Sequence, residues 1–231
     1  IGFALEQPAP AGPARLHVDY RAPISARDDH GIFKEQEGAD TYVFSQFEST
    51  SARRAFPCFD EPSPKVPWQL TLKIKEGDVA LSNTPIVAET KDSAGMKAVT
   101  FAETRPLPAY LVALAVGPFE MVDAGKAGKK GTPLRVVVPR GQKAEAAYAT
   151  ASTRPLLDEL EGFFGIPYPY EKLDIIAVPR TVSFGAMENA GLITCAKAIM
   201  LAKPQEDTIA FKRRYADIMT HEMAHQCSAT S

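Results

Sequence analysis

The sequence has few cysteines, little net charge and no long apolar run. Three cysteines (Cys58, Cys195 and Cys227) cannot form a disulfide framework, and so sparse a set favours a reducing compartment such as the cytoplasm, although the location stays open. A formal net charge of −2, with no basic stripe to contact phosphates, argues against nucleic acid as a partner. No apolar run approaches the roughly 18 residues of a membrane span, and the first residues lack the layout of a signal peptide.

What the sequence does contain is ordinary globular material. With 45% hydrophobic and 23% charged residues, its 231 residues suffice to bury a core and to form one large or two modest domains. The chain opens on Ile1 and stops shortly after His225, so we expect a piece of a longer protein. The oligomeric state stays open.

The first part of the chain predicts an antiparallel β domain. Up to about residue 140, proline and turn residues are dense and short β-prone runs follow one another without a long helix. The clearest run is 68–75, in which apolar and polar residues alternate to give one buried and one wet face. We therefore expect an antiparallel β-sandwich or saddle over residues 1–140. Further strands are expected at 15–20, 43–47, 86–90, 97–103, 109–116 and 134–138.

The second part of the chain, 141–231, is richer in helical patterns. An Ala-, Leu- and Glu-rich run at 142–165 predicts a helix that Pro155 kinks or divides. A strand is expected at 173–178, and a second helix at 204–226 has acidic residues in its first turn. The whole chain is thus predicted to be mixed β and α/β.

The last expected helix carries the sequence His221-Glu222-Met223-Ala224-His225. Residues four apart lie one turn apart on one helix face, so both imidazoles can reach one Zn²⁺ at roughly 2.0–2.1 Å. Glu222 lies beside them, placed to take a proton from a metal-activated water. Phe211, Tyr215 and Ile218 fall on the arc of the histidines, so we expect the ligand face to be the buried face. The alternative is two histidines without a metal on an ordinary helix.

A second candidate site is Gly185-Ala186-Met187-Glu188-Asn189, which lies between the expected strand and the last helix. Gly185 lets another backbone come close, and an edge strand here can hydrogen-bond an extended peptide. Glu188 would then present a carboxylate beside that edge. Such a group can hold a substrate's α-ammonium and so restrict cleavage to the first peptide bond. Taken alone, Glu188 is more simply explained as an exposed turn residue.

Together these two stretches resemble the zinc aminopeptidase family that includes aminopeptidase N and leukotriene A hydrolase. A third stretch, 46–48 (Gln-Phe-Glu) with 52–62, is similar to the β-domain signature of that family, and similarity extends from about residue 40 to 226. The resemblance implies an N-terminal β domain, truncated at its start, and the N-terminal part of a thermolysin-like zinc peptidase domain. It also implies Zn²⁺ as cofactor and peptides with a free N-terminus as substrates.

Carried over by position, the resemblance implies that His221 and His225 are zinc ligands and that Glu222 is the general base. Glu188 would be the anchor for the substrate's amine, and Glu48 would help to hold the same amine. The full set of substrate-binding residues that the resemblance implies is Glu48, Gly185, Ala186, Met187, Glu188 and Asn189.

The resemblance stops at the C-terminal end of the chain. After Gln226 the family continues with an aromatic pair and a glycine, whereas this chain has Cys227 and four further residues. Cys227 points about 200° away from His225 around a helix and cannot replace a ligand. The family's third zinc ligand, a glutamate, is absent, as is its intermediate-stabilising tyrosine. We therefore expect an aminopeptidase of which this stretch alone is poorly active or inactive.

Two alternatives stay open. A bifunctional relative with epoxide hydrolase activity shares the metal motif, and its signature is an altered 185–189 strand, which is unaltered here. A non-catalytic module that captures peptide N-termini without cutting them is the alternative from another class. Zinc content together with turnover of an aminoacyl reporter distinguishes these functions, while the preferred first residue stays open.

Overall fold

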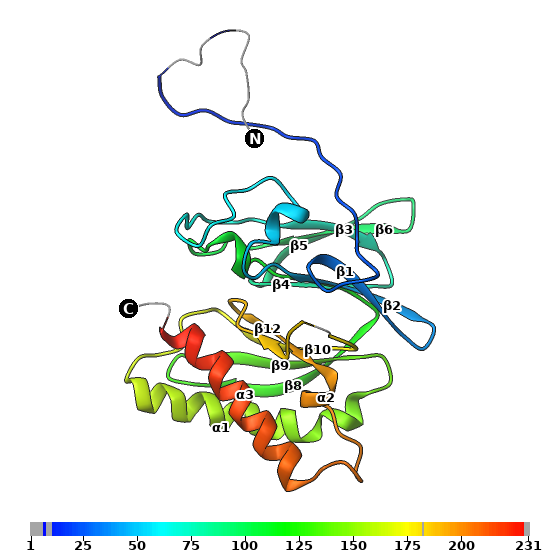
Figure 1. Cartoon of the computed structure of the whole chain (residues 1–231), viewed down its shortest axis with the longest axis vertical. Helices are drawn as coiled ribbons and strands as arrows, with labels where there is room; N and C mark the ends of the chain where they lie inside the picture. Colours follow the sequence, from blue (N-terminus) through cyan, green and yellow to red (C-terminus); the bar gives the residue numbers. More distant parts are fainter. Residues whose placement is uncertain (1–6, 8–10, 182, 229–231) are drawn as a thin grey trace.

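Short alternating runs in the first part of the chain pair into two antiparallel sheets (Figure 1). The structure is a computed structural model and describes residues 7, 11–181 and 183–228. One sheet has the order β1-β2-β7-β4 and the other β3-β6-β5. Their strands are β1 (Gly31–Glu37), β2 (Asp40–Gln46), β3 (Thr71–Lys75), β4 (Val79–Ser82), β5 (Ile86–Lys91), β6 (Met96–Phe101) and β7 (Leu114–Gly117).

The alternation at 68–75 is confirmed, because Ile74 is buried while Lys73 and Lys75 are exposed. The strand expected at 15–20 is wrong: this segment has no strand and is almost entirely exposed, with no sheet edge beside it to pair with. The run at 109–116 begins with a short 3₁₀ turn, Ala109–Leu111, and becomes strand at β7.

The two antiparallel sheets form the β lobe of the molecule, and a five-stranded mixed sheet forms the centre of a second lobe. Its order is β11-β12-β10-β9-β8, with β10 parallel to both neighbours and the two outer strands antiparallel. Because β8 and β9 precede residue 140, the sheet spans the expected division between 1–140 and 141–231, which stays a prediction. The strands are β8 (Phe119–Ala127), β9 (Thr132–Pro139), β10 (Leu173–Val178), β11 (Ala186–Met187) and β12 (Leu192–Ala196).

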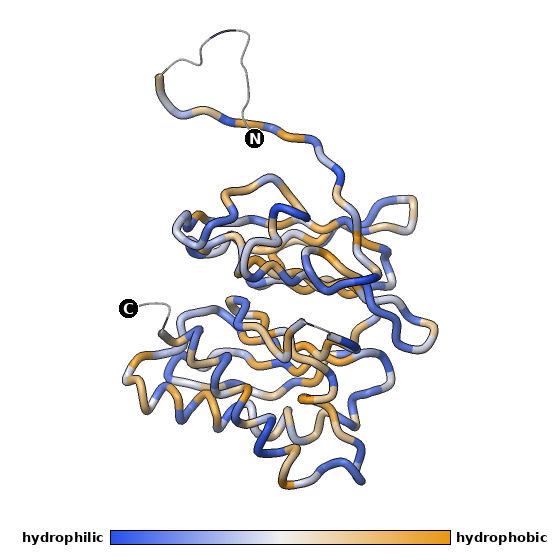
Figure 2. The backbone as a smooth tube through the Cα atoms, in the orientation of Figure 1, coloured by the Kyte–Doolittle hydropathy of each residue, from blue (hydrophilic) through white to orange (hydrophobic). Residues whose placement is uncertain are grey.

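Both faces of this sheet are covered, and its central strands β10 and β12 are buried along almost their whole length and are mostly apolar, with Asp174 as the charged exception in β10 (Figure 2). Val136 and Ile175 point to the helices, in a cluster that includes Tyr215. Val137 and Ile176 point to the other face, in a cluster with residues of the β1-β2-β7-β4 sheet. Mostly apolar strands of this kind are typical of a sheet that is buried on both sides. The fold is mixed β and α/β, as the sequence predicts.

Helices α1 (Ala147–Phe164), α2 (Lys197–Met200) and α3 (Ile209–Ser228) lie on the side of the sheet away from the β lobe (Figure 1). α1 runs through Pro155 as one helix, since this proline lies on the exposed face, where water reaches the carbonyl that loses its donor. α3 begins later than expected, because the Thr208 hydroxyl caps it by accepting the Phe211 N–H at 3.2 Å.

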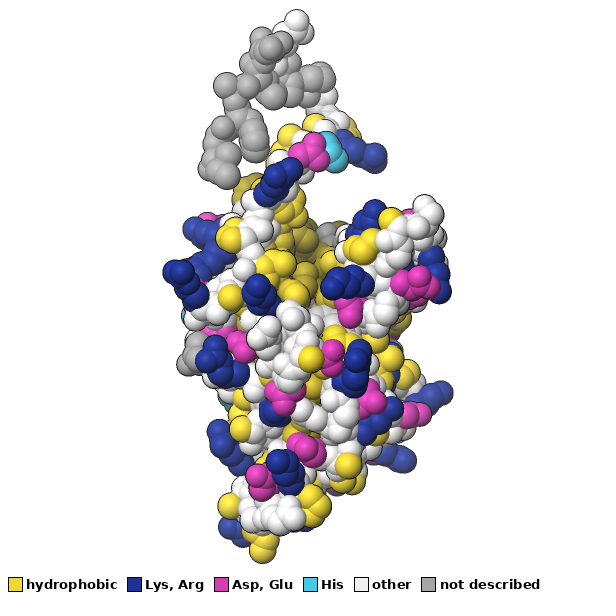
Figure 3. Space-filling view, turned by 90° about the vertical axis from the view of Figure 1, so that its right-hand side faces the viewer, with side chains coloured by type: hydrophobic (Ala, Val, Ile, Leu, Met, Phe, Trp, Pro, Cys, Tyr) yellow, Lys and Arg dark blue, Asp and Glu magenta, His cyan; other side chains and the backbone are white. Residues whose placement is uncertain are grey.

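The outer surface carries charges of both signs. On the face shown in Figure 3, Lys and Arg side chains alternate with Asp and Glu over both lobes. Among the described residues, no helix combines the length and the apolar character that crossing a membrane requires.

Candidate active site

The two histidines of α3 face each other across one helical turn. The Nε2 atoms of His221 and His225 lie 3.0 Å apart, and the ring planes are inclined at 84°. Two bonds of roughly 2.0–2.1 Å to one zinc ion can span such a separation. The pair therefore fits as two ligands of a single metal ion.

The prediction that the histidines share the buried face of α3 is wrong. Tyr215, Met219 and Met223 are all 0% exposed, whereas both His221 and His225 are exposed. Tyr215 lies on the expected arc, but Met219 and Met223 lie roughly 40° and 80° further round the helix. This arc packs against α1 and the five-stranded sheet, where it meets other apolar side chains. The histidine face is thus accessible.

A third protein ligand is not found in the part of the chain that the structure describes. Within residues 7, 11–181 and 183–228, no group of three or more His, Cys, Asp or Glu side chains is arranged to hold a metal ion. Cys227 is fully buried, away from the exposed histidine pair. Catalytic zinc sites use three protein ligands and leave one position open, so the pair supplies two of three.

Glu222 lies at the edge of the buried arc, with 6% of its surface exposed. Burial raises the pKa of its carboxyl group to about 7, and the carboxylates of Glu188 and Glu48 raise it as well. A carboxyl group with a pKa close to neutrality can accept a proton and return it, which suits general acid–base catalysis near pH 7.

Two stretches that are far apart in the sequence carry carboxylates that influence Glu222 on this helix. Partial burial raises the pKa of Glu48, the Glu188 carboxylate raises it further, and His225 opposes the shift. Glu48 follows β2, and Glu188 follows the edge strand β11. Because electrostatic effects weaken with distance, the influence of both carboxylates on the pKa of Glu222 indicates that Glu48 and Glu188 lie in its neighbourhood.

The 185–189 segment alternates between the core and the surface. Met187 and Asn189 are 1% and 2% exposed, so their side chains face inward, while Ala186 and Glu188 are half-buried. The side chains of Met187 and Asn189 can therefore support a substrate site only from behind. β11 has one neighbour, β12, which leaves its other edge without a strand partner among the described residues. A Cβ atom at Gly185 would lie 3.3 Å from Ile199 Cδ1, so the local packing is tight.

The 52–62 stretch folds the loop beside Glu48. The Arg53 backbone N–H and Nε donate to Asp60 Oδ2 at 3.0 and 2.8 Å, and Asp60 is 4% exposed. Phe47 packs in the same cluster as Phe56, with the rings edge to face at 5.4 Å. This stretch therefore fixes the position of Glu48 rather than supplying chemistry of its own.

Two residues near the site are not among the site residues that the sequence predicts. Tyr110 packs against Met187, and burial, Glu188 and Glu48 raise the pKa of its hydroxyl group. Gln226 hydrogen-bonds to the backbone that carries Glu188. Gln226 directly follows the histidine motif, but the contacts of both residues are long-range and do not follow from the spacing of the sequence.

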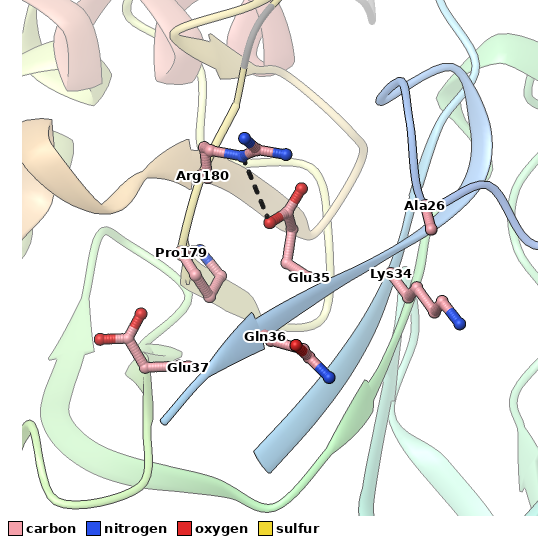
Figure 4. A pocket seen from close by; sticks show the side chains of 7 residues that line it. All are labelled: Ala26, Lys34, Glu35, Gln36, Glu37, Pro179 and Arg180. Carbon is pink, nitrogen blue, oxygen red and sulfur yellow. Dashed lines mark ion pairs between the residues drawn. The ribbon is translucent and has the colours of Figure 1, made fainter. Parts of the chain in front are cut away.

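A cavity in the structure lies away from these groups. It has a volume of about 450 Å³, and an ion pair between Arg180 and Glu35 (3.6 Å) crosses it (Figure 4). None of the candidate site residues lines it. Its walls are formed by Ala26, Lys34, Glu35, Gln36, Glu37, Pro179 and Arg180.

Comparison with known proteins agrees with this geometry. The Peptidase M1 N-terminal domain matches residues 3–111, and the Peptidase family M1 domain matches residues 148–228. The chain is 36% identical over 230 residues to the puromycin-sensitive aminopeptidase of Caenorhabditis elegans, covering 96% of this chain and 24% of that protein. It is 34% identical over 222 residues to aminopeptidase N of Acetobacter pasteurianus, covering 94% of this chain and 61% of that protein.

A third relative is the glutamyl aminopeptidase of Bos taurus, 38% identical over 194 residues, which cover 84% of this chain and 20% of that protein. The chain thus spans between a fifth and about three fifths of the length of these relatives. The matches to both M1 domains run through the β lobe and the histidine helix. The chain belongs to peptidase family M1.

Proposed function

We propose that this chain is part of a zinc-dependent aminopeptidase that releases N-terminal residues from peptides. The observation that carries the proposal is the histidine pair of α3, which fits one metal ion, together with Glu222 on the same helix, whose pKa the nearby carboxylates of Glu188 and Glu48 raise. The aminopeptidase names of the relatives support the same class of reaction.

His221 and His225 would hold the metal. When bound, zinc polarises a carbonyl group and lowers the pKa of water. Glu222, adjacent to His221 on the same helix, would accept a proton from the attacking water and deliver it to the leaving amine.

Substrate binding would use the edge of β11 and the two remaining carboxylates. An extended peptide can pair with the edge of β11 that faces away from β12, which has no strand partner among the described residues. Glu188 and Glu48 offer negative charge to an α-ammonium group, and an N-acetylated peptide lacks that charge. Because the anchor lies beside the histidines, the first peptide bond is the one that meets Glu222.

We further propose that these 231 residues by themselves hold zinc weakly. Two neutral imidazoles leave the charge of the ion uncompensated, whereas a carboxylate ligand would offset part of it. The described residues contain no group of three ligands, which favours a second candidate function for this polypeptide alone: capture of peptide N-termini without cleavage. In that case peptide binding needs a free amine and turnover is absent.

The test compares the chain alone with the full-length protein that carries it. Zinc content and turnover of several unblocked aminoacyl reporters are measured for both, with N-acetylated reporters and Glu222→Gln as controls. The proposal expects the full-length protein to bind zinc, to cleave only unblocked reporters and to lose turnover in Glu222→Gln. Cleavage of blocked reporters at an equal rate would contradict it. Turnover by the chain alone at the rate of the full-length protein would show that its two histidines suffice.

A further inference from the structure

Gln226 is adjacent to the second histidine in sequence, but its side chain is buried in the turn that carries Glu188. Only 2% of its surface is exposed. Its Nε2 donates to the Asn189 carbonyl at 2.9 Å and to the Glu188 carbonyl at 3.3 Å. Its Oε1 accepts the Gly191 N–H at 3.3 Å and the hydroxyl of Tyr168. Both donors and both acceptor positions of the amide are therefore in use.

The turn at 188–191 is also held from two other directions. Asn83, from the β lobe, donates to the Ala190 carbonyl at 2.9 Å. The ammonium group of Lys172 donates to the Gly191 carbonyl at 2.7 Å. Of these three groups, Gln226 alone belongs to α3, the helix that carries the histidines. Its amide therefore ties the turn directly to the candidate metal ligands.

We propose that Gln226 is a positioning residue, which sets the distance between the Glu188 carboxylate and the histidine pair. The inference rests on the proposed aminopeptidase function and adds to it the group that fixes the register of a bound N-terminus. Glu188 is half-buried at the end of a two-residue edge strand, so β11 gives it little support of its own. A buried amide with four partners restricts the turn that follows. A displacement of the anchor by about 1 Å is enough to lower turnover by about two orders of magnitude.

The chemistry of the amide explains which substitutions test the role. In Gln226→Glu the shape is kept, but a carboxylate replaces the two donors and faces the carbonyls of Glu188 and Asn189. Both carbonyls then lose the donor on α3, although the Asn189 carbonyl keeps the Leu192 N–H at 3.0 Å, and the turn is expected to move away from α3. Tyr168→Phe is milder, since it removes one donor to Oε1 and leaves the ring in place.

The matched control is Thr153→Val. The Thr153 hydroxyl is a buried hydrogen-bond partner of the Tyr215 hydroxyl at 3.1 Å, so the variant loses a buried contact between α1 and α3. This contact does not touch the 188–191 turn. It reports what a general loss of stability at α3 does to turnover.

The experiment uses the zinc-loaded full-length protein and measures kcat, KM and zinc content with unblocked aminoacyl reporters. Gln226→Glu is expected to lower kcat/KM by about 10- to 100-fold, mainly through KM, with zinc content retained. Tyr168→Phe is expected to shift KM in the same direction by a smaller factor, and Thr153→Val to leave KM unchanged. In a Glu188→Ala background, Gln226→Glu should add little, because the anchor that it positions is already gone.

Several results would overturn the inference. One is an unchanged KM in both Gln226→Glu and Tyr168→Phe. Another is a full, additive loss in the Glu188→Ala background, which would mean that Gln226 acts independently of the anchor. Loss of zinc from Gln226→Glu would assign it to the metal site instead. An unmutated, zinc-loaded protein without turnover would overturn the proposed function and this inference together, whereas the other three results leave the proposed function standing.

Discussion

Replacing Asp174 by alanine should unbalance a buried charge network beneath the Glu188 turn. The Asp174 side chain is fully buried in β10, where Oδ1 accepts Arg135 Nε and Oδ2 accepts Arg135 Nη2, both at 2.7 Å. Lys172 Nζ lies 2.8 Å from Asp174 Oδ2 and also donates to the Gly191 carbonyl. The alanine variant therefore leaves two cations without their common partner.

The two cations differ in how much they lose. The Lys172 side chain is 6% exposed and stays buried without a counter-charge, whereas the Arg135 side chain is 37% exposed and can reach water. Removing one partner of a buried ion pair costs about 3–5 kcal/mol. We expect a loss of that size, a large part of the stability of a typical domain, in urea unfolding followed by circular dichroism. As a control, Asp207→Ala breaks an exposed pair with Lys212 and should cost at most about 1 kcal/mol.

The stability lost in Asp174→Ala should also depend on pH, and it should become smaller in acid. Burial raises the pKa of Asp174, but Lys172 and Arg135 outweigh burial and hold it below its ordinary value. A carboxyl group with a lowered pKa in the folded state stabilises the protein above its unfolded pKa of about 3.9, and this stabilisation disappears as pH falls through the folded pKa. The stability difference between the unmutated chain and Asp174→Ala should therefore be constant near pH 7 and shrink below about pH 4. An Asp174→Ala variant as stable at pH 7 as Asp207→Ala would refute the reasoning.

Three further variants test the site and its support. Glu188→Ala in the zinc-loaded full-length protein should lower turnover of unblocked reporters by about two to four orders of magnitude and leave zinc content unchanged; loss of zinc would show that Glu188 is misassigned. Gly191→Ala should lower the free energy of unfolding by about 1–3 kcal/mol or more, because the φ angle of Gly191 is +68° and the new Cβ would lie 2.3 Å from Asn83 O. A urea midpoint within error of that of the unmutated chain would mean that the turn adjusts to the new side chain without cost. Met223→Ala should cost about 2–5 kcal/mol in the same assay, and a negligible cost would contradict its burial against α1 and the sheet.

Sequence periodicity predicts that α3 is a helix but not which face it buries. The spacing of His221 and His225 places them on one side, and the structure has them there. Large apolar residues lie on both arcs of the helix, however. The pattern therefore predicts burial of the arc with Phe211 and Ile218 as readily as burial of the arc with Met219. The neighbours decide between the two arcs: α1 and the sheet lie on the Met219 side, and they follow from the three-dimensional arrangement of distant segments.

The sequence pattern also predicts some strands of the structure but not others. Alternation is clear at 68–75, where one face is wet, and β3 forms there. β1 (GIFKEQE) and β4 (VALS) give weak signals because one is largely polar and the other is four residues long. Both become strands because neighbouring strands offer hydrogen-bond partners. The number of strands in the central sheet is likewise not predictable from local patterns, because the pairing of β9 with β10 joins residues that are far apart in the sequence.

The candidate site combines residues that a pattern can find with residues that it cannot. Glu48, Glu188 and Glu222 lie in recognisable stretches because their chemistry demands particular residue types. Gln226 and Lys172 support the same site through backbone carbonyls, which any residue possesses, so their partners leave no trace in sequence spacing. Support of this kind becomes visible only when the hydrogen bonds of a buried segment are counted one by one.

The hydrogen bonds of the 188–191 turn connect it to both lobes and to α3. Asn83 contributes from the β lobe, Lys172 from the segment before β10, and Gln226 from α3. Each group donates to a carbonyl of the turn, and the carbonyls of Asn189 and Gly191 also accept backbone N–H groups, so removing any one of the three side chains leaves a buried carbonyl with fewer donors. An anchor for a substrate amine must keep its distance from the metal ligands while substrates enter and leave. A turn fastened from three directions meets that requirement, whereas a free edge strand of two residues would not.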